Sequence, residues 1–153
     1  MSTIHLRQLT TASPAQFLAA LTDFGPERAK LFGRSATEYL RVHELGQSHA
    51  DVTEGSGGIW ERLRYDWSDP ARVVMKTTGS NTWGGASGHT YTFTRLADGT
   101  TQVDAVVVRE GKNLKGRLLG GLLGLLGKRV LGGELAKTAK AVEARYTGLA
   151  GDA

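Results

Sequence analysis

The chain has 153 residues, of which 40% are hydrophobic and 22% charged, with a formal net charge of +4 at pH 7. A chain of this size buries about 70% of the surface that its unfolded form exposes, so residues 1–153 are expected to form one domain without a stapling disulfide or metal. There is no cysteine, which excludes disulfide scaffolds, thiol nucleophiles, zinc ribbons and iron–sulfur sites. Glycine is the anomaly, because 21 residues are about twice the usual share of roughly 7%.

The N-terminal part predicts one strand and two short helices. Ile4 and Leu6 alternate with polar residues, which is typical of a half-buried strand. The motif Ser-Pro-Ala-Gln at residues 13–16 has the pattern of a capping box with proline at the first helical position. We expect a helix over residues 14–23 and, after a Gly-Pro break, a second one over residues 26–32 that ends near Gly33.

The chain shows neither a secretory signal nor a membrane span. Its first residues, MSTIHLRQL, lack an apolar stretch and a cleavage-site pattern. The longest run of apolar residues and glycine, 118–127, is shorter than the roughly 20 residues that cross a bilayer. A cytoplasmic location is therefore the expectation.

From residue 37 the pattern changes to short segments separated by turn signals. The predicted strands cover residues 38–45, 49–54, 59–67, 72–78, 88–96 and 101–109. The clearest hairpin signal is Asp98-Gly99 between two alternating runs. Short links imply an antiparallel meander, and the first strand brings the predicted sheet to seven.

Period-2 alternation assigns the faces of three of these strands. Arg62, Arg64 and Asp66 share one face, which must be the outer one. The residues predicted to point inward are Ile59, Glu61, Leu63, Tyr65, Trp67, Val73, Met75, Thr77, His89, Tyr91 and Phe93. The strand over 101–109 stays ambiguous, because Val106, Val107 and Val108 are consecutive.

The region from 113 to about 146 is helical in composition, although it contains seven glycines. At 100° per residue, the leucines of residues 114–126 lie on one side of the helix, and Gly116, Gly120, Gly124 and Gly127 lie on the opposite side. After Gly132-Gly133 the apolar stripe moves to the side where the glycines had been. One alternative, which we prefer, is that the helix kinks or breaks at this pair. The other is that it is continuous, with a glycine face inward that leaves room for a ligand and a leucine face outward.

The same region carries a cluster of positive charge. Lys112, Lys115, Arg117, Lys128 and Arg129 follow one another with no acidic residue between them. Such a stretch suits an anionic ligand, a membrane surface or nucleic acid, and it is equally typical of a solvated helix flank. Nucleic acid is disfavoured, because Tyr91 and Phe93, which stacking on bases would use, are predicted to point inward.

The order of strand, two short helices, six strands and a long helix is that of the helix-grip fold. Residues 3–147 resemble the START-like (SRPBCC) superfamily in this order of elements and in four segments: SPAQFLAALTDF, GIWERLRYDW, GHTYTFTR and VVVREGKNLKGR. The sequences of these segments are similar to those of actinobacterial members. That superfamily includes polyketide cyclases/aromatases and lipid-transfer domains. The resemblance implies an α+β fold in which a curved seven-stranded antiparallel sheet grips the last helix around a ligand cavity, and it implies no single activity.

Within this fold the glycine-rich loops 55–58 and 79–88 and the start of the last helix are expected at the mouth of the cavity. Trp83 is then a candidate lid residue, although the alternative is that the loops are ordinary turns and Trp83 packs locally.

No motif for metal, nucleotide or serine-hydrolase chemistry is present. The four histidines lack metal-ligand spacing, and neither a phosphate-cradling loop nor a G-x-S-x-G elbow occurs. No cofactor and no metal site are expected. The candidate catalytic residues are Glu61, His89 and Tyr65, since a buried carboxylate beside a histidine or tyrosine can move a proton to a carbonyl compound. The alternative is that Glu61 pairs with an internal Arg or His and only shapes the cavity.

Three functional hypotheses follow. The leading one is binding or carriage of a hydrophobic small molecule, lipid or polyketide-like. The second is a polyketide cyclase/aromatase or dehydratase that uses Glu61 and His89. The third is membrane association or another interaction through residues 112–131. The expected ligand-binding residues are Leu63, Tyr65, Trp67, Met75, Thr77, Trp83, His89, Tyr91, Phe93, Leu118 and Leu122.

Overall fold

The computed structural model describes residues 1–33 and 37–151. Its elements in chain order are β1 (Ser2–Thr10), α1 (Pro14–Leu21), α2 (Arg28–Phe32), β2 (Arg41–Leu45), β3 (His49–Ser56), β4 (Ile59–Asp66), β5 (Arg72–Ser80), β6 (Gly88–Arg95), β7 (Thr101–Arg109) and α3 (Leu114–Gly151).

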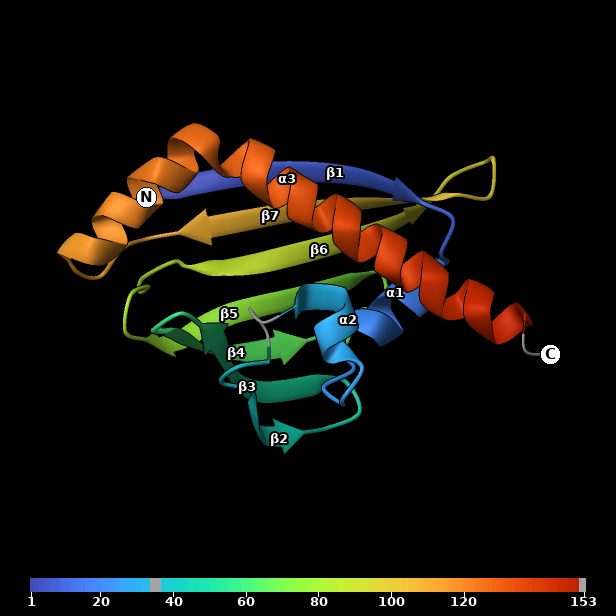
Figure 1. The fold of residues 1–153 in the computed structure, drawn as a ribbon, viewed down its shortest axis with the longest axis horizontal. Helices are drawn as coiled ribbons and strands as arrows, with labels where there is room; N and C mark the ends of the chain where they lie inside the picture. The colour runs from blue at the N-terminus through green and yellow to red at the C-terminus, as the bar shows by residue number, and fades with distance from the viewer. Residues whose placement is uncertain (34–36, 152–153) are drawn as a thin grey trace.

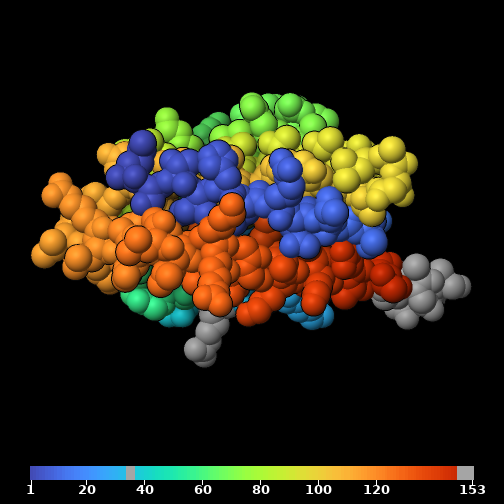
Figure 2. All heavy atoms as spheres, turned by 90° about the horizontal axis from the view of Figure 1, so that it is seen from above, coloured from blue at the N-terminus to red at the C-terminus, as the bar shows by residue number. Residues whose placement is uncertain are grey.

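All seven strands form one antiparallel sheet. The order is β1-β7-β6-β5-β4-β3-β2, so β2 to β7 form a meander and β1 joins it beside the last strand. Figure 1 shows α3 running obliquely across the sheet, with α1 and α2 on the same side of it. In the view from above, β1 and α3 lie side by side along the length of the molecule (Figure 2). The predicted helix-grip arrangement is confirmed.

The local signals of the N-terminal part act as expected. The Ser13 hydroxyl accepts from the Gln16 amide, and the Gln16 side chain accepts from the Ser13 amide, so the capping box is complete. Helix α1 is two residues shorter than predicted, and α2 ends at Gly33, which has a φ of 62°. A positive φ is a conformation that glycine adopts without steric cost. Strand β2 begins at Arg41, three residues later than predicted, because residues 37–39 form a turn.

The predicted inward faces agree with the burial of the sheet. Alternate residues are buried along β4 and β5. On β7 the ambiguity is resolved by Val103, Ala105 and Val107, which are buried, while Val106 and Val108 are half-buried. These side chains pack with Phe17 and Leu21 of α1 and with Leu135, Ala139 and Val142 of α3 in the main core.

Helix α3 is continuous from Leu114 to Gly151, so it does not break at Gly132-Gly133. Figure 1 shows that it changes direction earlier, in its orange N-terminal part. The structure matches the other alternative in its outward leucines: Leu114, Leu118, Leu122, Leu125 and Leu126 are between 55% and 83% exposed.

The opposite, glycine face of α3 packs against β1 and the loop before β6. A Cβ on Gly116 would lie 2.3 Å from the Thr82 carbonyl oxygen, and one on Gly127 would lie 3.2 Å from Cγ1 of Ile4. The Ser2 hydroxyl donates to the Gly120 carbonyl at 2.8 Å. The glycines therefore allow close approach of the helix to its neighbours, and at these positions they do not leave room for a ligand.

Candidate functional site

A cavity of about 540 Å³ lies between the sheet and α3. This volume falls within the range of about 300–1,000 Å³ that is usual for small-molecule sites. Most of its walls are aliphatic or aromatic, and four of its charged side chains form two clusters; Ser56, Glu134 and Thr138 are further polar groups of the lining. The lining residues are Leu6, Arg28, Phe32, Glu54, Gly55, Ser56, Ile59, Glu61, Leu63, Tyr65, Met75, Trp83, His89, Tyr91, Val107, Arg109, Leu123, Leu131, Glu134, Leu135 and Thr138.

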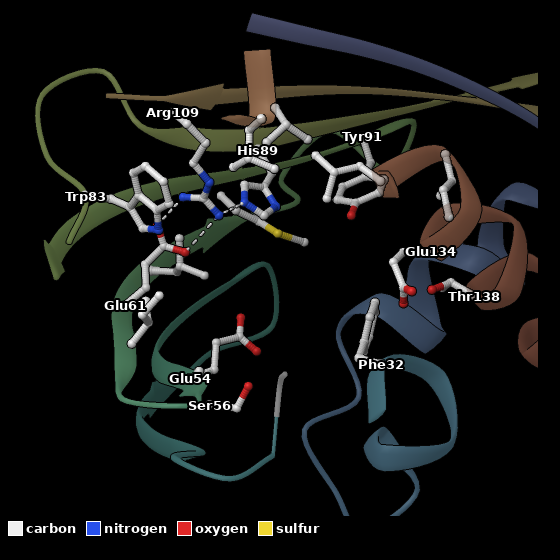
Figure 3. A pocket seen from close by; sticks show the side chains of 18 of the residues that line it. Phe32, Glu54, Ser56, Glu61, Trp83, His89, Tyr91, Arg109, Glu134 and Thr138 are labelled. Carbon is white, nitrogen blue, oxygen red and sulfur yellow. Dashed lines mark hydrogen bonds and ion pairs between the residues drawn. The ribbon is translucent and has the colours of Figure 1, made fainter. Parts of the chain in front are cut away.

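The first polar cluster joins Glu61 on β4 with Arg109 at the end of β7. Nη1 of Arg109 lies 2.5 Å from Oε2 of Glu61, and Nη2 donates to Oε1 at 3.3 Å. The Thr77 hydroxyl donates to the same Oε2 at 2.7 Å. The Arg109 guanidinium also lies over the Trp83 ring, 5.0 Å from its centroid. Figure 3 shows Glu61, Trp83, Arg109 and His89 gathered at one end of the cavity.

His89 completes this cluster as a neutral ring. Nη2 of Arg109 lies 2.6 Å from Nε2 of His89. Because a guanidinium only donates, Nε2 is the acceptor and the ring proton sits on Nδ1. Burial, together with the charge of Arg109, lowers the pKa of His89 to about 4. His89 is therefore uncharged at neutral pH.

Glu61 is ionised. Burial alone would raise the pKa of its carboxyl, but the charge of Arg109 and the hydrogen bonds from Arg109 and Thr77 outweigh that effect and lower it. A carboxylate held in this way is a weak proton acceptor, and its neighbour His89 is a weak base with one nitrogen already occupied. The arrangement is better suited to holding a fixed polar group than to moving protons.

The second polar cluster surrounds Arg28, which is only 1% exposed. Its Nη1 donates to the carbonyls of Leu21 and Asp23, both at 3.0 Å. Its Nη2 donates to Glu54 at 3.2 Å and to the Tyr65 hydroxyl at 2.9 Å. The Tyr65 hydroxyl in turn donates to Glu54. Every charge in the cluster thus has a partner, as a buried ion pair requires.

Two aromatic rings hold Arg28 in place. Its guanidinium carbon lies 4.6 Å from the ring centroid of Phe24 and 4.7 Å from that of Phe32. Burial and the nearby charge of Glu54 raise the pKa of Tyr65 well above its ordinary value and that of Tyr91 to about 12. Both hydroxyls therefore stay protonated over the physiological range. The proton of Tyr65 is donated to Glu54, so of the two it is Tyr91 that can donate a hydrogen bond toward the cavity.

Most of the predicted site residues line the cavity. Seven of them do so: Glu61, Leu63, Tyr65, Met75, Trp83, His89 and Tyr91. Thr77 lies behind the wall, where its hydroxyl supports Glu61. Of the alternatives for Glu61, the structure shows the internal pairing, with Arg109 as the partner.

Four predicted ligand-binding residues lie elsewhere. Leu118 and Leu122 are 63% and 55% exposed and point away from the cavity. Leu123 and Leu131 take their place in the lining, because the glycine face of α3 turns inward. Trp67 and Phe93 lie at another hollow, beside Pro14 and Leu18 of α1, where the Phe93 ring packs 5.6 Å from that of Phe17.

Four charged lining residues were missed: Arg28, Glu54, Arg109 and Glu134. Two of them carried a usable signal. Glu54 shares its face with the buried residues Ala50 and Val52, and Arg109 continues the buried face of Val103, Ala105 and Val107. On β7, however, the three consecutive valines at 106–108 do not indicate which alternate residues point inward. Arg28 lies in a five-residue helix, which is too short for periodicity to indicate a buried face.

The glycine-rich loops contribute unequally to the cavity. Gly55, Ser56 and Ile59 of the β3–β4 hairpin line it and are part-exposed. Trp83 of the 79–88 loop is 7% exposed, is bridged to Gly111 and packs against Gly120 of α3. Trp83 thus forms a packed end wall of the cavity.

Within residues 1–33 and 37–151, no group of three or more His, Cys, Asp or Glu side chains is arranged to hold a metal ion. Over the same described residues, no helix combines the length and the apolar character needed to cross a bilayer.

A curved antiparallel sheet that holds a long C-terminal helix over an internal cavity defines the START-like helix-grip fold. Solved structures with the same fold include the Zhui aromatase/cyclase from a Streptomyces species, with a TM-score of 0.72 at 15% identity over 94% of each chain. A START superfamily protein from Mycobacterium smegmatis has a TM-score of 0.70 at 14% identity, over 97% of this chain and 99% of that one. TTHA0849 from Thermus thermophilus has a TM-score of 0.68 at 16% identity, over 96% and 98% of the two chains.

The sequence itself matches no family model and no curated protein. At these identities the structural likeness shows the fold alone.

Proposed function

We propose that this protein binds a hydrophobic small molecule, lipid or polyketide-like, in the cavity between the sheet and α3. The observation that carries the proposal is a mainly apolar cavity of about 540 Å³ in which four of the five charged lining side chains form two ion pairs, Arg28 with Glu54 and Arg109 with Glu61. Apolar walls supply affinity, and a few fixed polar groups supply orientation. The similarity of the fold to a START superfamily protein supports the same proposal.

The ligand would present a polar group to the end of the cavity that Trp83, His89 and Arg109 form. The proton on Nδ1 of His89 and, farther along the cavity, the hydroxyl of Tyr91 are the neutral donors of this part of the lining, whereas Arg109 already donates to Glu61 and His89. A carbonyl or hydroxyl oxygen matches these neutral donors.

The alternative is a cyclase/aromatase or dehydratase that uses Glu61 and His89, and the observation in its favour is the likeness to the Zhui aromatase/cyclase. The geometry favours binding instead, since Glu61 is ion-paired and His89 has a pKa of about 4. Once a converted substrate is known, the double variant Glu61→Gln/His89→Gln separates the two. Unchanged turnover excludes this acid–base pair, whereas loss of turnover with unchanged substrate binding supports catalysis.

The proposal is tested by native mass spectrometry of the protein purified from its own host, in which a co-purified small molecule is expected. A second measurement uses a naphthalene-sulfonate dye whose fluorescence rises in apolar sites. We expect saturable binding of one dye per chain, weakened at least about tenfold by Val107→Trp, which fills the cavity. Val42→Trp is the matched control, because Val42 lies on β2 outside the cavity and is 40% exposed. Equal dye binding by both variants would contradict the proposal.

A further inference from the structure

The N-terminal half of α3 exposes an apolar surface that no other described part of the chain covers. We call it the leucine face: Leu114, Leu118, Leu122, Leu125, Leu126 and Val130, each 54–83% exposed. At 100° per residue these six side chains fall within an arc of about 160°. In Figures 1 and 2 the orange part of α3 extends past the sheet at one end of the molecule. The face is therefore accessible to a broad, flat partner.

Positive charge accompanies the leucine face. Lys115, Arg117, Lys128 and Arg129 are exposed, and within the described structure none of them forms an ion pair. Arg117 and Lys128 lie along one edge of the face, and Lys115 and Arg129 lie within it. Their side chains are long enough to leave the charged ends at headgroup level while their stems contact apolar surface. Lys112 is less available, since it donates to the Ser80 carbonyl.

The sequence around this face is free of negative charge. Between Glu110 and Glu134 there is no acidic residue. A second copy is a poor occupant, because a two-fold contact between leucine faces would bring the cations of both copies together with no acid to pair them. An anionic bilayer surface satisfies both features, since it accepts apolar side chains and attracts Lys and Arg.

We propose that the leucine face of α3 docks the protein onto an anionic membrane surface, with the helix lying in the plane of the interface. The inference goes beyond the proposed function and does not depend on what the cavity holds. The helix is not apolar enough to span the bilayer, so binding is peripheral and sensitive to salt.

The test is co-sedimentation with phosphatidylcholine vesicles that contain or lack phosphatidylglycerol. We expect binding to the anionic vesicles, and weaker binding to the neutral ones or at high salt. Leu118→Asp should reduce binding at least about tenfold, because a side chain that enters the acyl boundary is replaced by a charge. The matched control is Leu45→Asp, since Leu45 is 59% exposed on β2, outside the face.

A second pair of variants tests the contribution of positive charge to vesicle binding. Lys128→Gln/Arg129→Gln should lower the affinity about 25-fold, at about fivefold per cation removed. The control Arg64→Gln/Lys76→Gln removes two exposed cations from the outer face of the sheet and should leave the affinity near that of the parent protein.

Three outcomes would overturn the proposal. They are equal binding to neutral and anionic vesicles, parent-like binding by both Leu118→Asp and Leu125→Asp, and a dimer in sedimentation equilibrium that Leu118→Asp dissociates. Two leucine variants are used so that misfolding of one, detected by near-UV circular dichroism, leaves the test intact.

Discussion

Glu54 and Glu61 lie directly opposite each other on β3 and β4, and each carboxylate is paired with its own arginine. Like charges in such a cross-strand position are destabilising. Arg28 reaches Glu54 from α2, and Arg109 reaches Glu61 from the end of β7. The two ion pairs therefore connect the β3–β4 hairpin to two distant parts of the chain, and the polar lining of the cavity depends on both.

Removing Arg28 should be strongly destabilising. The variant Arg28→Met leaves Glu54 buried without its cation and removes the donor to the Tyr65 hydroxyl. Breaking one side of a buried pair costs about 3–5 kcal/mol. The measurement is the free energy of unfolding in urea. Arg62→Met, which breaks the exposed pair with Asp51, should cost less than about 1 kcal/mol, and equal losses for the two variants would contradict this account.

Thr77 is expected to act through Glu61. Thr77→Val keeps the shape of the side chain but removes the hydroxyl that donates to Oε2 of Glu61 at 2.7 Å. Losing a hydrogen bond to a charged group costs about 1.5–3 kcal/mol, and the pKa of Glu61 should rise, which NMR titration of its side-chain carbon can follow. Thr78→Val changes an exposed neighbour on the same strand and should shift stability by less than about 0.5 kcal/mol. A Glu61 pKa that does not move in Thr77→Val would refute the role.

His89 should make stability depend on pH. Its pKa is about 4 in the folded protein and 6.5 when unperturbed, so between these values the unfolded state binds a proton that the folded state does not. Stability is then fully present above pH 6.5 and is lost as pH falls toward 4, by up to about 3 kcal/mol. His89→Gln should flatten this part of a urea-unfolding profile measured against pH, and an unchanged slope would count against the low pKa.

Two glycines of α3 should respond oppositely to alanine. A Cβ on Gly116 meets the Thr82 carbonyl at 2.3 Å, whereas one on Gly121 has nothing within 4 Å. Gly116→Ala forces backbone movement and should cost about 1–3 kcal/mol. Gly121→Ala gains helix propensity of about 0.5–1 kcal/mol. Thermal unfolding of the two variants checks the pair, and a stabilised Gly116→Ala would show that the helix does not pack through this glycine.

Much of the fold was predictable because its signals are local. The alternation along residues 59–66, the Asp98-Gly99 turn and the capping box at Ser13 each fix a short piece of backbone, and short links between strands leave few topologies. The course of α3 was less predictable. Its apolar stripe changes face near Gly132, and only the packing of β1 against the glycines decides that the leucines point outward.

The candidate site was predicted in part for the same reason. Inward positions on β4 and β6 follow from parity, so Glu61 and His89 were found. Their chemistry depends on Arg109, which is 48 residues from Glu61 in sequence, and no local pattern reports such a pairing. The burial of Arg28 could not be predicted, because a five-residue helix is too short to show a hydrophobic period. The charge of Arg28 is nevertheless essential to the cluster around Glu54.

The position of β1 has a consequence for how the chain folds. The first strand pairs with β7 from Ser2↔Arg109 to Thr10↔Thr101, and α3 then packs over it. Strand β1 therefore pairs with a strand that lies about 90 to 107 residues further along the chain. Pairings this distant in sequence slow folding, because the entropy of closing the loop is lost before the contacts form. Closure of β1 onto β7 is thus expected to be a late step, and the cavity exists only once it is complete.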